Sequence, residues 1–518
     1  MGIRSDISGS RQSGSEAKEL SIVDGAVFIL CFVYSFWCVG ERLVARDEGF
    51  YTYAAQLLLE GQHPYIDFFY PQMPLLPYVY ALGGLLGGTT WGSYRAVSAL
   101  LFGGILLFSY GGVAVHRGRV WAIVALFLVS FCHLSFEWFP VVQTYALSVF
   151  LLLVSITLLS LDSQKRWTAF SVGLFFALTV QTRLFFAPLI VVPLLTYYFS
   201  SERRKLLPRF FYGLVVGSVP SVIFIGLNPD SYFFSNLGYH LIRSSQTLSE
   251  EVEHKWRIFE VLFSLGRPSQ KFDSFQTPFI FGGMFVALFL SFRLQRAARI
   301  FVSVAVLLFL VSFLPNPTYV QYFVSVVPFA IAGVIIPLAS FYRSQTRLGA
   351  KLIIAIGILF GAIYLKDVPG DMERYFKTGQ GVIGIGGPSR AVDWNIPRVV
   401  EVGKSVERLC RVNEEVLALW PGYLIGAHRR AVPKTENHFG FRAAEQLSDE
   451  EQDLFHVISV DRVSMMIKNR KIACVVGHKS AFRPQLREAL AKAGYAKAKN
   501  VGGVYLYRVS PKAPSENS

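Results

Sequence analysis

Long apolar runs recur along the first two thirds of the chain, and charged residues interrupt them only in short loops. The segments 22–40, 97–115 and 145–161 are almost uninterrupted, and each approaches the ~20 residues that a helix needs to cross a bilayer. Segment 74–88 is apolar but short and glycine-rich, so we expect it to lie in the membrane interface. Membrane-spanning helices are expected at about eleven positions, namely 22–40, 95–114, 119–135, 142–161, 167–182, 184–200, 208–227, 278–292, 299–314, 321–341 and 350–366.

The composition agrees with this pattern. Hydrophobic residues make up 53% of the 518 residues and charged residues only 16%, whereas a soluble domain averages about 25% charged residues. Beyond about residue 370 the composition becomes that of a soluble protein, with short strands expected at 416–421, 472–477 and 503–508 and helices at 405–410, 449–469 and 484–493. The expected fold class is a polytopic α-helical membrane protein with a small C-terminal α/β domain. The glycine-rich segment 381–387 is expected to be a linker turn.

The distribution of positive charge predicts the orientation. Lys and Arg concentrate in the segments 4–18, 117–119, 165–166, 203–209, 293–299 and 343–351. The short opposite loops carry only Arg42, Arg46, Arg95 and Arg183. Because positive residues favour the cytoplasmic side, we expect a disordered cytoplasmic tail at 1–20, a membrane domain at 21–366 and an extracytoplasmic domain at 367–518. The outer loops are then 41–94 and 228–278, and the protein is expected in the cell (inner) membrane.

Two further features of composition bear on partners. The net charge of +15 could suggest nucleic acid, but the positive residues lie in loops beside apolar runs, so membrane lipids and not nucleic acid are expected as partners. Cys410 and Cys474 lie in the polar C-terminal part, where they could pair in an oxidising compartment.

The first outer loop holds the most informative polar residues. Asp47 and Glu48 begin an amphipathic helix of about three turns, which we expect to lie on the membrane surface. These carboxylates can simply cap that helix and offset its dipole, or they can take part in chemistry. Asp67 follows in an aromatic and proline-rich segment, as a turn residue or as a second carboxylate folded back against Asp47. Carboxylates grouped at the edge of a dry cavity can act as a base and as metal ligands.

These motifs resemble a known family. The Asp47–Glu48 pair at the end of the first span, the helix ending at Glu60-Gly61, and the segment containing Pro64 and Asp67 are similar to the GT-C superfamily. The likeness is to its protein O-mannosyltransferase and lipid A aminoarabinose transferase branch. Segments 91–98, 182–183 and 315–322 add weaker similarities. Relatives often carry an acidic residue in the second outer loop, where this chain has Gln143, with Glu137 earlier in the loop.

The resemblance implies an inverting glycosyltransferase that moves a sugar from a polyprenyl phosphate to an acceptor hydroxyl on the extracytoplasmic face. The acceptor is expected to be a glycan, lipid or protein. Asp47 is the expected base, while Asp67 and Glu48 are expected to orient the acceptor or to hold a divalent metal cation. Arg95 is a further candidate for phosphate binding. Donor phosphate-binding positions are expected at Arg183, Arg243, Tyr319, Gln321 and Tyr322, and acceptor or loop positions at Tyr70, His240 and Glu137.

Simpler roles remain open for these residues. Arg183 can extend toward lipid phosphates, Arg243 and His240 can be solvated surface residues, and the aromatic residues of 319–322 can be interfacial anchors. A transporter or flippase of a lipid-linked saccharide is the alternative function, and an assembly protein without chemistry is another. A transporter predicts a polar path across the bundle, whereas an enzyme predicts that Asp47 and Asp67 open into one outer cavity.

Overall fold

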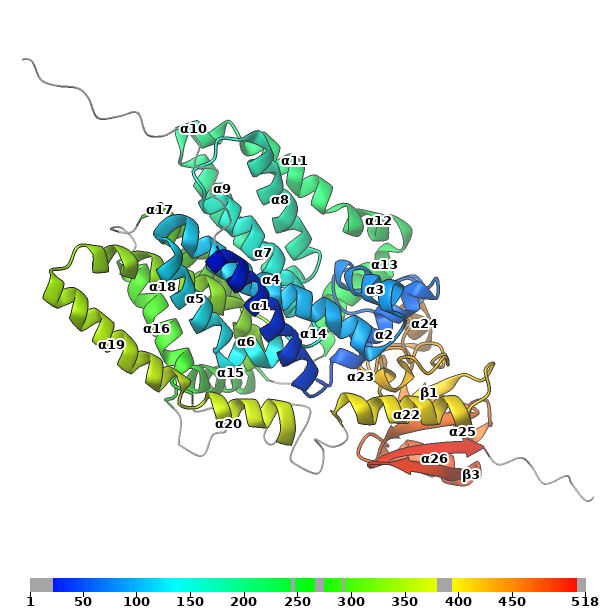
Figure 1. Ribbon diagram of the computed structural model, residues 1–518. Helices are drawn as coiled ribbons and strands as arrows, with labels where there is room; N and C mark the ends of the chain where they lie inside the picture. Colours follow the sequence, from blue (N-terminus) through cyan, green and yellow to red (C-terminus); the bar gives the residue numbers. More distant parts are fainter. Residues whose placement is uncertain are drawn as a thin grey trace, which may run out of the picture.

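The computed structural model describes residues 22–243, 247–265, 274–290, 293, 295–379 and 394–509. Within these residues the chain forms a helical bundle with a smaller C-terminal α/β domain packed against one end (Figure 1). This arrangement confirms the mostly helical fold with a small C-terminal sheet. The tail expected at 1–20 and the linker turn expected at 381–387 lie outside the described residues.

The helices of the bundle follow the apolar segments closely. In chain order they are α1 (Ile22–Glu41), α2 (Glu48–Leu59), α3 (Leu75–Gly87), α4 (Trp91–Arg117), α5 (Arg119–Ser130), α6 (His133–Trp138), α7 (Thr144–Ser160), α8 (Arg166–Val180), η1 (Leu184–Ile190), α9 (Val191–Tyr198), α10 (Ser201–Arg204), α11 (Leu207–Gly217), α12 (Val219–Leu227), α13 (Pro229–Phe233), η2 (Phe234–Gly238), α14 (Tyr239–Ile242), α15 (Leu248–Leu262), α16 (Gln276–Phe289), α17 (Arg296–Val311), η4 (Val320–Val326), α18 (Val327–Arg343), α19 (Arg347–Leu365), α20 (Val368–Glu373) and η5 (Arg374–Thr378).

Helix therefore occupies each segment in which a span is expected. Among the described residues, four helices are long and apolar enough to cross a membrane by themselves, namely Ile22–Glu41, Trp91–Arg117, Val320–Arg343 and Arg347–Thr378. The pair α11 and α12, bent by 45°, makes a fifth if it is one span, and six other apolar helices have 10–17 residues. The total of about eleven crossings stays a prediction.

Close approach of helix backbones stabilises the bundle. At Gly173 on α8, a Cβ atom would collide with the Phe210 carbonyl of α11, and at Gly213 on α11 it would collide with the Phe170 carbonyl of α8. Small residues at such crossings are typical of helix pairs in membranes, where packing and not water exclusion drives association. This pair fixes the direction of α8, whose C-terminal end leads into Arg183.

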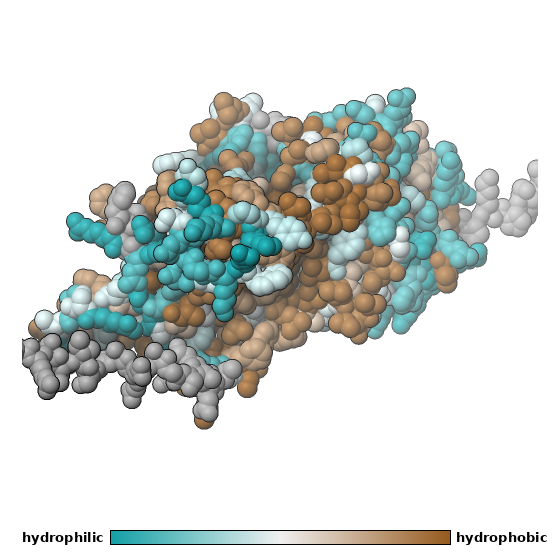
Figure 2. All heavy atoms as spheres, turned by 90° about the horizontal axis from the view of Figure 1, so that it is seen from above, coloured by the Kyte–Doolittle hydropathy of each residue, from teal (hydrophilic) through white to brown (hydrophobic). Residues whose placement is uncertain are grey.

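Apolar side chains cover much of the outside of the bundle. Leu348, Leu352, Ile356 and Ile358 on α19 are all more than half exposed, and α19 stands to one side of the other helices in Figure 1. Figure 2 shows broad hydrophobic areas in the middle of one face, with hydrophilic residues gathered toward its ends. A surface this apolar is stable only in contact with lipid.

The C-terminal domain is built on a four-stranded sheet of order β1-β2-β4-β3. β1 pairs parallel with β2, while β4 pairs antiparallel with both β2 and β3. Cys410 and Cys474 form a disulfide, so this pairing is confirmed. The elements are α22 (Ile396–Leu409), β1 (Val416–Ala418), η7 (Pro421–Leu424), α23 (Gly440–Ala444), α24 (Asp449–Leu454), α25 (Val460–Lys468), β2 (Cys474–His478), α26 (Pro484–Lys492), β3 (Tyr495–Val501) and β4 (Val504–Val509).

Trp420 fixes this domain to α2. Its indole Nε1 donates a hydrogen bond to the Arg46 carbonyl at 2.6 Å. Its ring lies so close to Gly49 that a Cβ atom there would fall within 3.0 Å of the ring atoms, so only glycine fits this position. Tyr53, one turn further along α2, accepts a hydrogen bond from the Ala431 amide at 2.9 Å. The helix that follows Asp47 is therefore held from both sides.

Candidate active site

Asp47 occupies the junction between the first predicted span and α2. It is half-buried, and its side chain makes no capping hydrogen bond although it precedes the helix. Across the described residues, no side chain forms an ion pair with its carboxylate. The simple capping role is therefore not what the structure shows, and the carboxylate is available to a ligand.

Glu48, the next residue, has the opposite environment. Both carboxylate oxygens are buried and bound, since Arg95 donates to each of them at 2.7 and 2.8 Å. The amides of Ala45 and Val142 add bonds of 3.1 and 3.0 Å. Breaking these four hydrogen bonds to a buried carboxylate would cost much free energy, so Glu48 holds the loop in shape. Arg95, fully engaged in this pair, lies outside the lining of the cavity described next.

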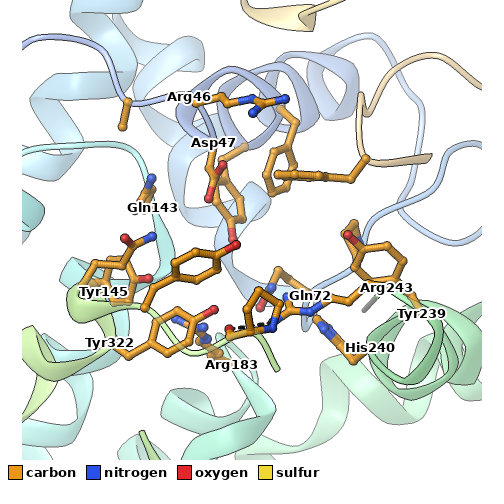
Figure 3. A pocket seen from close by; sticks show the side chains of 18 of the residues that line it. Arg46, Asp47, Gln72, Gln143, Tyr145, Arg183, Tyr239, His240, Arg243 and Tyr322 are labelled. Atoms are coloured by element: carbon orange, nitrogen blue, oxygen red, sulfur yellow. Dashed lines mark hydrogen bonds between the residues drawn. The ribbon is translucent and has the colours of Figure 1, made fainter. Parts of the chain in front are cut away.

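The carboxylate of Asp47 borders a cavity of about 230 Å³ at the end of the bundle that faces the C-terminal domain. Figure 3 shows Asp47 on one side of this space and Arg183, Arg243, His240 and Tyr322 on the other. The cavity is lined by Ala45, Arg46, Asp47, Phe50, Tyr51, Pro71, Gln72, Trp138, Gln143, Tyr145, Arg183, Tyr239, His240, Arg243, Pro317, Tyr319, Gln321, Tyr322, Phe439 and Arg442.

Aromatic rings hold the guanidinium of Arg183 in place. Its Cζ atom lies 4.5 Å from the ring centroids of both Phe185 and Tyr322, and 5.2 Å from that of Tyr145. Its hydrogen bond to Thr144 Oγ1 is long at 3.4 Å. Stacking of this kind stabilises the cation without using its donors, so Arg183 can still bind an anion bidentately.

Arg243 and His240 enter the cavity from the second predicted outer loop. Arg243 donates from Nε to the Asn316 carbonyl at 2.6 Å, which leaves other guanidinium donors for a ligand. Burial, together with the charges of Arg243 and Arg183, lowers the pKa of His240 to about 3. At neutral pH the imidazole is uncharged and offers one donor and one acceptor nitrogen.

The balance of charge in the cavity favours an anion. Among the described residues that line it are four arginines, Arg46, Arg183, Arg243 and Arg442, and one carboxylate, Asp47. No ion pair joins any of the four arginines to a described acid. Burial raises the pKa of Asp47 above its ordinary value, while Arg46, Arg183 and Arg243 oppose that shift. A carboxylate with a raised pKa beside uncommitted cations is typical of a general base near an anionic substrate.

Besides Glu48 and Arg95, three further residues expected at the site lie outside this cavity lining. Asp67 is exposed and accepts a hydrogen bond from the His63 amide at 2.7 Å in a local turn, instead of lying against Asp47. Tyr70 is fully buried, with its ring centroid 6.3 Å from that of Tyr51, which does line the cavity. Glu137 is buried next to His133 and is not part of the lining, although the neighbouring Trp138 is.

Several lining residues were not singled out from the sequence. Gln72 and Tyr51 come from the informative first loop but lack a distinctive motif. In the sequence, Gln143 is only a departure from the expected acid and has no predicted role, and its buried Oε1 has no hydrogen-bond partner among the described residues. Phe439 and Arg442 come from the C-terminal domain, and no local pattern signals that this segment reaches the cavity.

The expected metal ligands Asp67 and Glu48 are not brought together. Glu48 is saturated by Arg95 and backbone amides, and Asp67 is exposed in its turn. Within the described residues, the side chains with metal-binding geometry are instead His133, Glu137 and Asp371. A metal held by Asp67 and Glu48 stays a prediction, and this geometry does not support it.

Comparison with known proteins bears on the fold. The chain shares its overall fold with solved structures of ArnT, and it places Asp47 between α1 and α2 at a basic cavity beside the C-terminal domain. No protein-family model and no curated protein matches the sequence, so the assignment comes from structure.

The solved structures that share the fold include ArnT from Cupriavidus metallidurans. ArnT bound to undecaprenyl phosphate matches with a TM-score of 0.67 and 14% identity over 95% of this chain and 99% of that one. ArnT in the apo state gives a TM-score of 0.68 and 13% identity over the same shares. The arabinofuranosyltransferase AftD from Mycobacteria gives 0.43 and 14% identity, over 95% of this chain and 40% of that one.

Proposed function

We propose that this protein is an inverting glycosyltransferase that moves a sugar from a polyprenyl-phosphate donor to an acceptor hydroxyl on the extracytoplasmic face. The observation that carries the proposal is the cavity in which the uncommitted carboxylate of Asp47 faces the guanidinium groups of Arg183 and Arg243. The GT-C fold, which this chain shares with an ArnT structure that holds undecaprenyl phosphate, supports the class of donor.

Asp47 acts as the base in this proposal. The acceptor oxygen attacks the anomeric carbon of the donor sugar, the bond between that carbon and the phosphate oxygen breaks, and the acceptor proton passes to the Asp47 carboxylate. Attack from the face opposite the phosphate inverts the anomeric centre in a single displacement. The raised pKa of Asp47 brings its basicity closer to the working pH, which favours proton transfer.

Arg183 and Arg243 stabilise the leaving group. A polyprenyl phosphodiester carries one negative charge, and its phosphate product carries more, so fixed cations bind the transition state and the product more tightly than the donor. The ring stack around Arg183 keeps that cation oriented before the donor arrives. Gln143 and Gln321, each with a buried Oε1 that lacks a partner among the described residues, are positioned to accept hydrogen bonds from sugar hydroxyls.

Two features support an extracytoplasmic site. The C-terminal domain carries the Cys410–Cys474 disulfide, and disulfides persist in oxidising compartments outside the cytoplasm. The lysines and arginines concentrate in the loops expected on the opposite side. Phe439 and Arg442 of the C-terminal domain line the cavity, which supports a reaction on the same side as that domain.

The two cavities found among the described residues do not form the polar path that a transporter requires. One of them, about 820 Å³ between α5, α16, α18 and α19, is lined almost entirely by apolar side chains such as Phe127, Ile335 and Ile354. The polar cavity is confined to the end of the bundle that carries the C-terminal domain. The geometry therefore favours chemistry at one face over passage through the bundle.

A transfer assay tests the proposal directly. Purified protein in nanodiscs is incubated with a panel of polyprenyl-phosphate sugars and acceptors, and glycosylated product and released polyprenyl phosphate are measured by mass spectrometry. We expect Asp47→Asn to lower turnover by about 10²–10⁴-fold. Asp230→Asn, an exposed first-turn residue of α13 outside the cavity, is the matched control. Full turnover by Asp47→Asn would show that Asp47 is not the base.

A further inference from the structure

Three buried side chains from two distant parts of the chain meet behind the wall of the cavity. His133 and Glu137 belong to α6, and Asp371 belongs to α20, which follows the last predicted span. One potential ligand atom from each lies within 4.8 Å of those of the other two. The side chains belong to residues that are only 3%, 1% and 5% exposed, so bulk water does not solvate them.

Each of these side chains has one polar atom committed and one left over. His133 Nδ1 lies 3.1 Å from Glu137 Oε1, and Asp371 Oδ1 pairs with Arg374. Among the described residues, His133 Nε2, Glu137 Oε2 and Asp371 Oδ2 are buried and have no hydrogen-bond partner. Buried polar atoms without partners are costly, and these three belong to the side chains whose metal-binding geometry groups them into one buried cluster, which favours one shared ligand.

The neighbouring arginines do not satisfy these atoms. Arg42 donates to the carbonyl oxygens of Glu137 and Leu43, and its guanidinium lies 4.8 Å from the Tyr375 ring centroid. Arg374 pairs with the other oxygen of Asp371. The two cations lessen the repulsion between the carboxylates, while His133 Nε2, Glu137 Oε2 and Asp371 Oδ2 have no hydrogen-bond partner among the described residues. A cation bound directly to those atoms completes the cluster.

The ligand set selects the kind of cation. One imidazole nitrogen with two carboxylate oxygens suits Zn²⁺ and similar transition metals, whereas Mg²⁺ and Ca²⁺ prefer oxygen ligands alone. The contact between His133 and Glu137 and the ion pair between Asp371 and Arg374 also fit a metal site, because such contacts orient ligating groups toward a metal.

We propose that His133, Glu137 and Asp371 bind a divalent transition-metal ion, for which Zn²⁺ is the best match. The ion joins α6 to α20, and so ties the segment before the C-terminal domain to the membrane bundle. Because Trp138 follows Glu137 directly and lines the substrate cavity, the ion also fixes that wall. The site is separate from the cavity and does not depend on the proposed transfer reaction.

Metal content tests the proposal. Full-length protein in detergent is stripped with EDTA, incubated with excess ZnCl₂, passed through gel filtration and analysed by inductively coupled plasma mass spectrometry. We expect about one zinc per chain, and a zinc affinity weakened by more than about tenfold in Glu137→Gln and in Asp371→Asn. Adding zinc to the stripped wild-type protein should raise its melting temperature, because the ion binds the folded state.

Matched variants separate this site from other acidic or imidazole groups. Asp67→Asn and His240→Ala, which alter the turn and the substrate cavity, should keep the wild-type zinc content. X-ray absorption at the zinc edge should show one imidazole among oxygen ligands. The proposal fails if monodisperse wild-type protein retains no zinc. It fails equally if Asp371→Asn and Glu137→Gln bind zinc as the wild type does, which would leave the cluster a proton-sharing network.

Discussion

Arg95 and Glu48 form a bidentate ion pair inside the protein, with Nε 2.7 Å from Oε1 and Nη2 2.8 Å from Oε2. The two side chains are 1% and 0% exposed. Arg95 also donates to the carbonyls of Val39 and Leu43 at 3.0 and 3.2 Å, so the pair joins the end of α1 to the start of α2. It therefore shapes the loop that presents Asp47.

Loss of this ion pair should lower the free energy of unfolding, which an activity assay alone does not measure. In Glu48→Gln the buried Arg95 keeps its charge without a counter-charge, so we expect a loss of about 3–5 kcal/mol. Thermal unfolding in detergent, followed by intrinsic fluorescence, measures it. Asp47→Asn is the neighbouring control and should melt like the wild type, since its carboxylate has no ion-pair partner among the described residues. Equal melting of Glu48→Gln and wild type would contradict the structural role of Glu48.

The pH dependence of transfer should follow Asp47. A base works only when deprotonated, and burial raises the pKa of Asp47, so kcat/KM should fall as the pH drops through that raised value. Arg243 lowers this pKa. Removing its charge in Arg243→Gln should therefore move the acid limb of the profile to higher pH.

Arg442→Gln is the matched control for that shift. Arg442 lines the same cavity but is not among the groups that shift the pKa of Asp47, so its acid limb should stay in place. An acid limb that moves to lower pH in Arg243→Gln, or does not move at all, would show that another group is the base.

Arg183 should resist conservative replacement. Lysine keeps the charge but loses the planar stack on Tyr322 and Phe185 and the bidentate donors. We expect Arg183→Lys to raise the donor KM roughly tenfold, which corresponds to about 1.4 kcal/mol, and Arg183→Gln to raise it further. Donor titration at saturating acceptor measures both. Wild-type kinetics in Arg183→Lys would mean that only charge matters at this position.

The Cys410–Cys474 disulfide gives a test of both stability and sidedness. Changing both residues to serine should lower the stability of the C-terminal domain by about 2–4 kcal/mol, measured by protease resistance. In membranes isolated with an alkylating agent present, wild-type Cys410 and Cys474 should stay unlabelled until a reductant is added. Labelling without reductant would place the domain in a reducing compartment and reverse the proposed orientation.

The sequence predicted much of the site because the spans and their outer ends can be read locally. Asp47, Arg183, Arg243 and His240 lie at or beyond the ends of apolar runs, and the structure brings them into one cavity. Asp67 lies in a similar position along the chain. Its side chain instead accepts a hydrogen bond from the His63 amide in a local turn. Residue spacing does not show whether Asp67 turns toward His63 or toward Asp47.

The other differences between prediction and structure arise from the direction of side chains on a helix and from contacts between distant parts of the chain. Glu137 and Trp138 are adjacent, yet only Trp138 lines the cavity, because successive residues of a helix point about 100° apart. Arg442 and Asp47 are far apart in the sequence, yet both line the cavity. This arrangement depends on how Trp420 docks on Gly49. Neither outcome follows from hydrophobic periodicity.

Because the C-terminal domain docks on α2, both parts of the chain contribute residues to the pocket. The proposed base Asp47 and the proposed phosphate-binding residues Arg183 and Arg243 come from the bundle, while Phe439 and Arg442 come from the C-terminal domain. Neither half of the chain can form the pocket when expressed alone. If the proposed roles hold, substitutions around Phe439 can change which acceptors fit the pocket while the donor-binding residues stay the same.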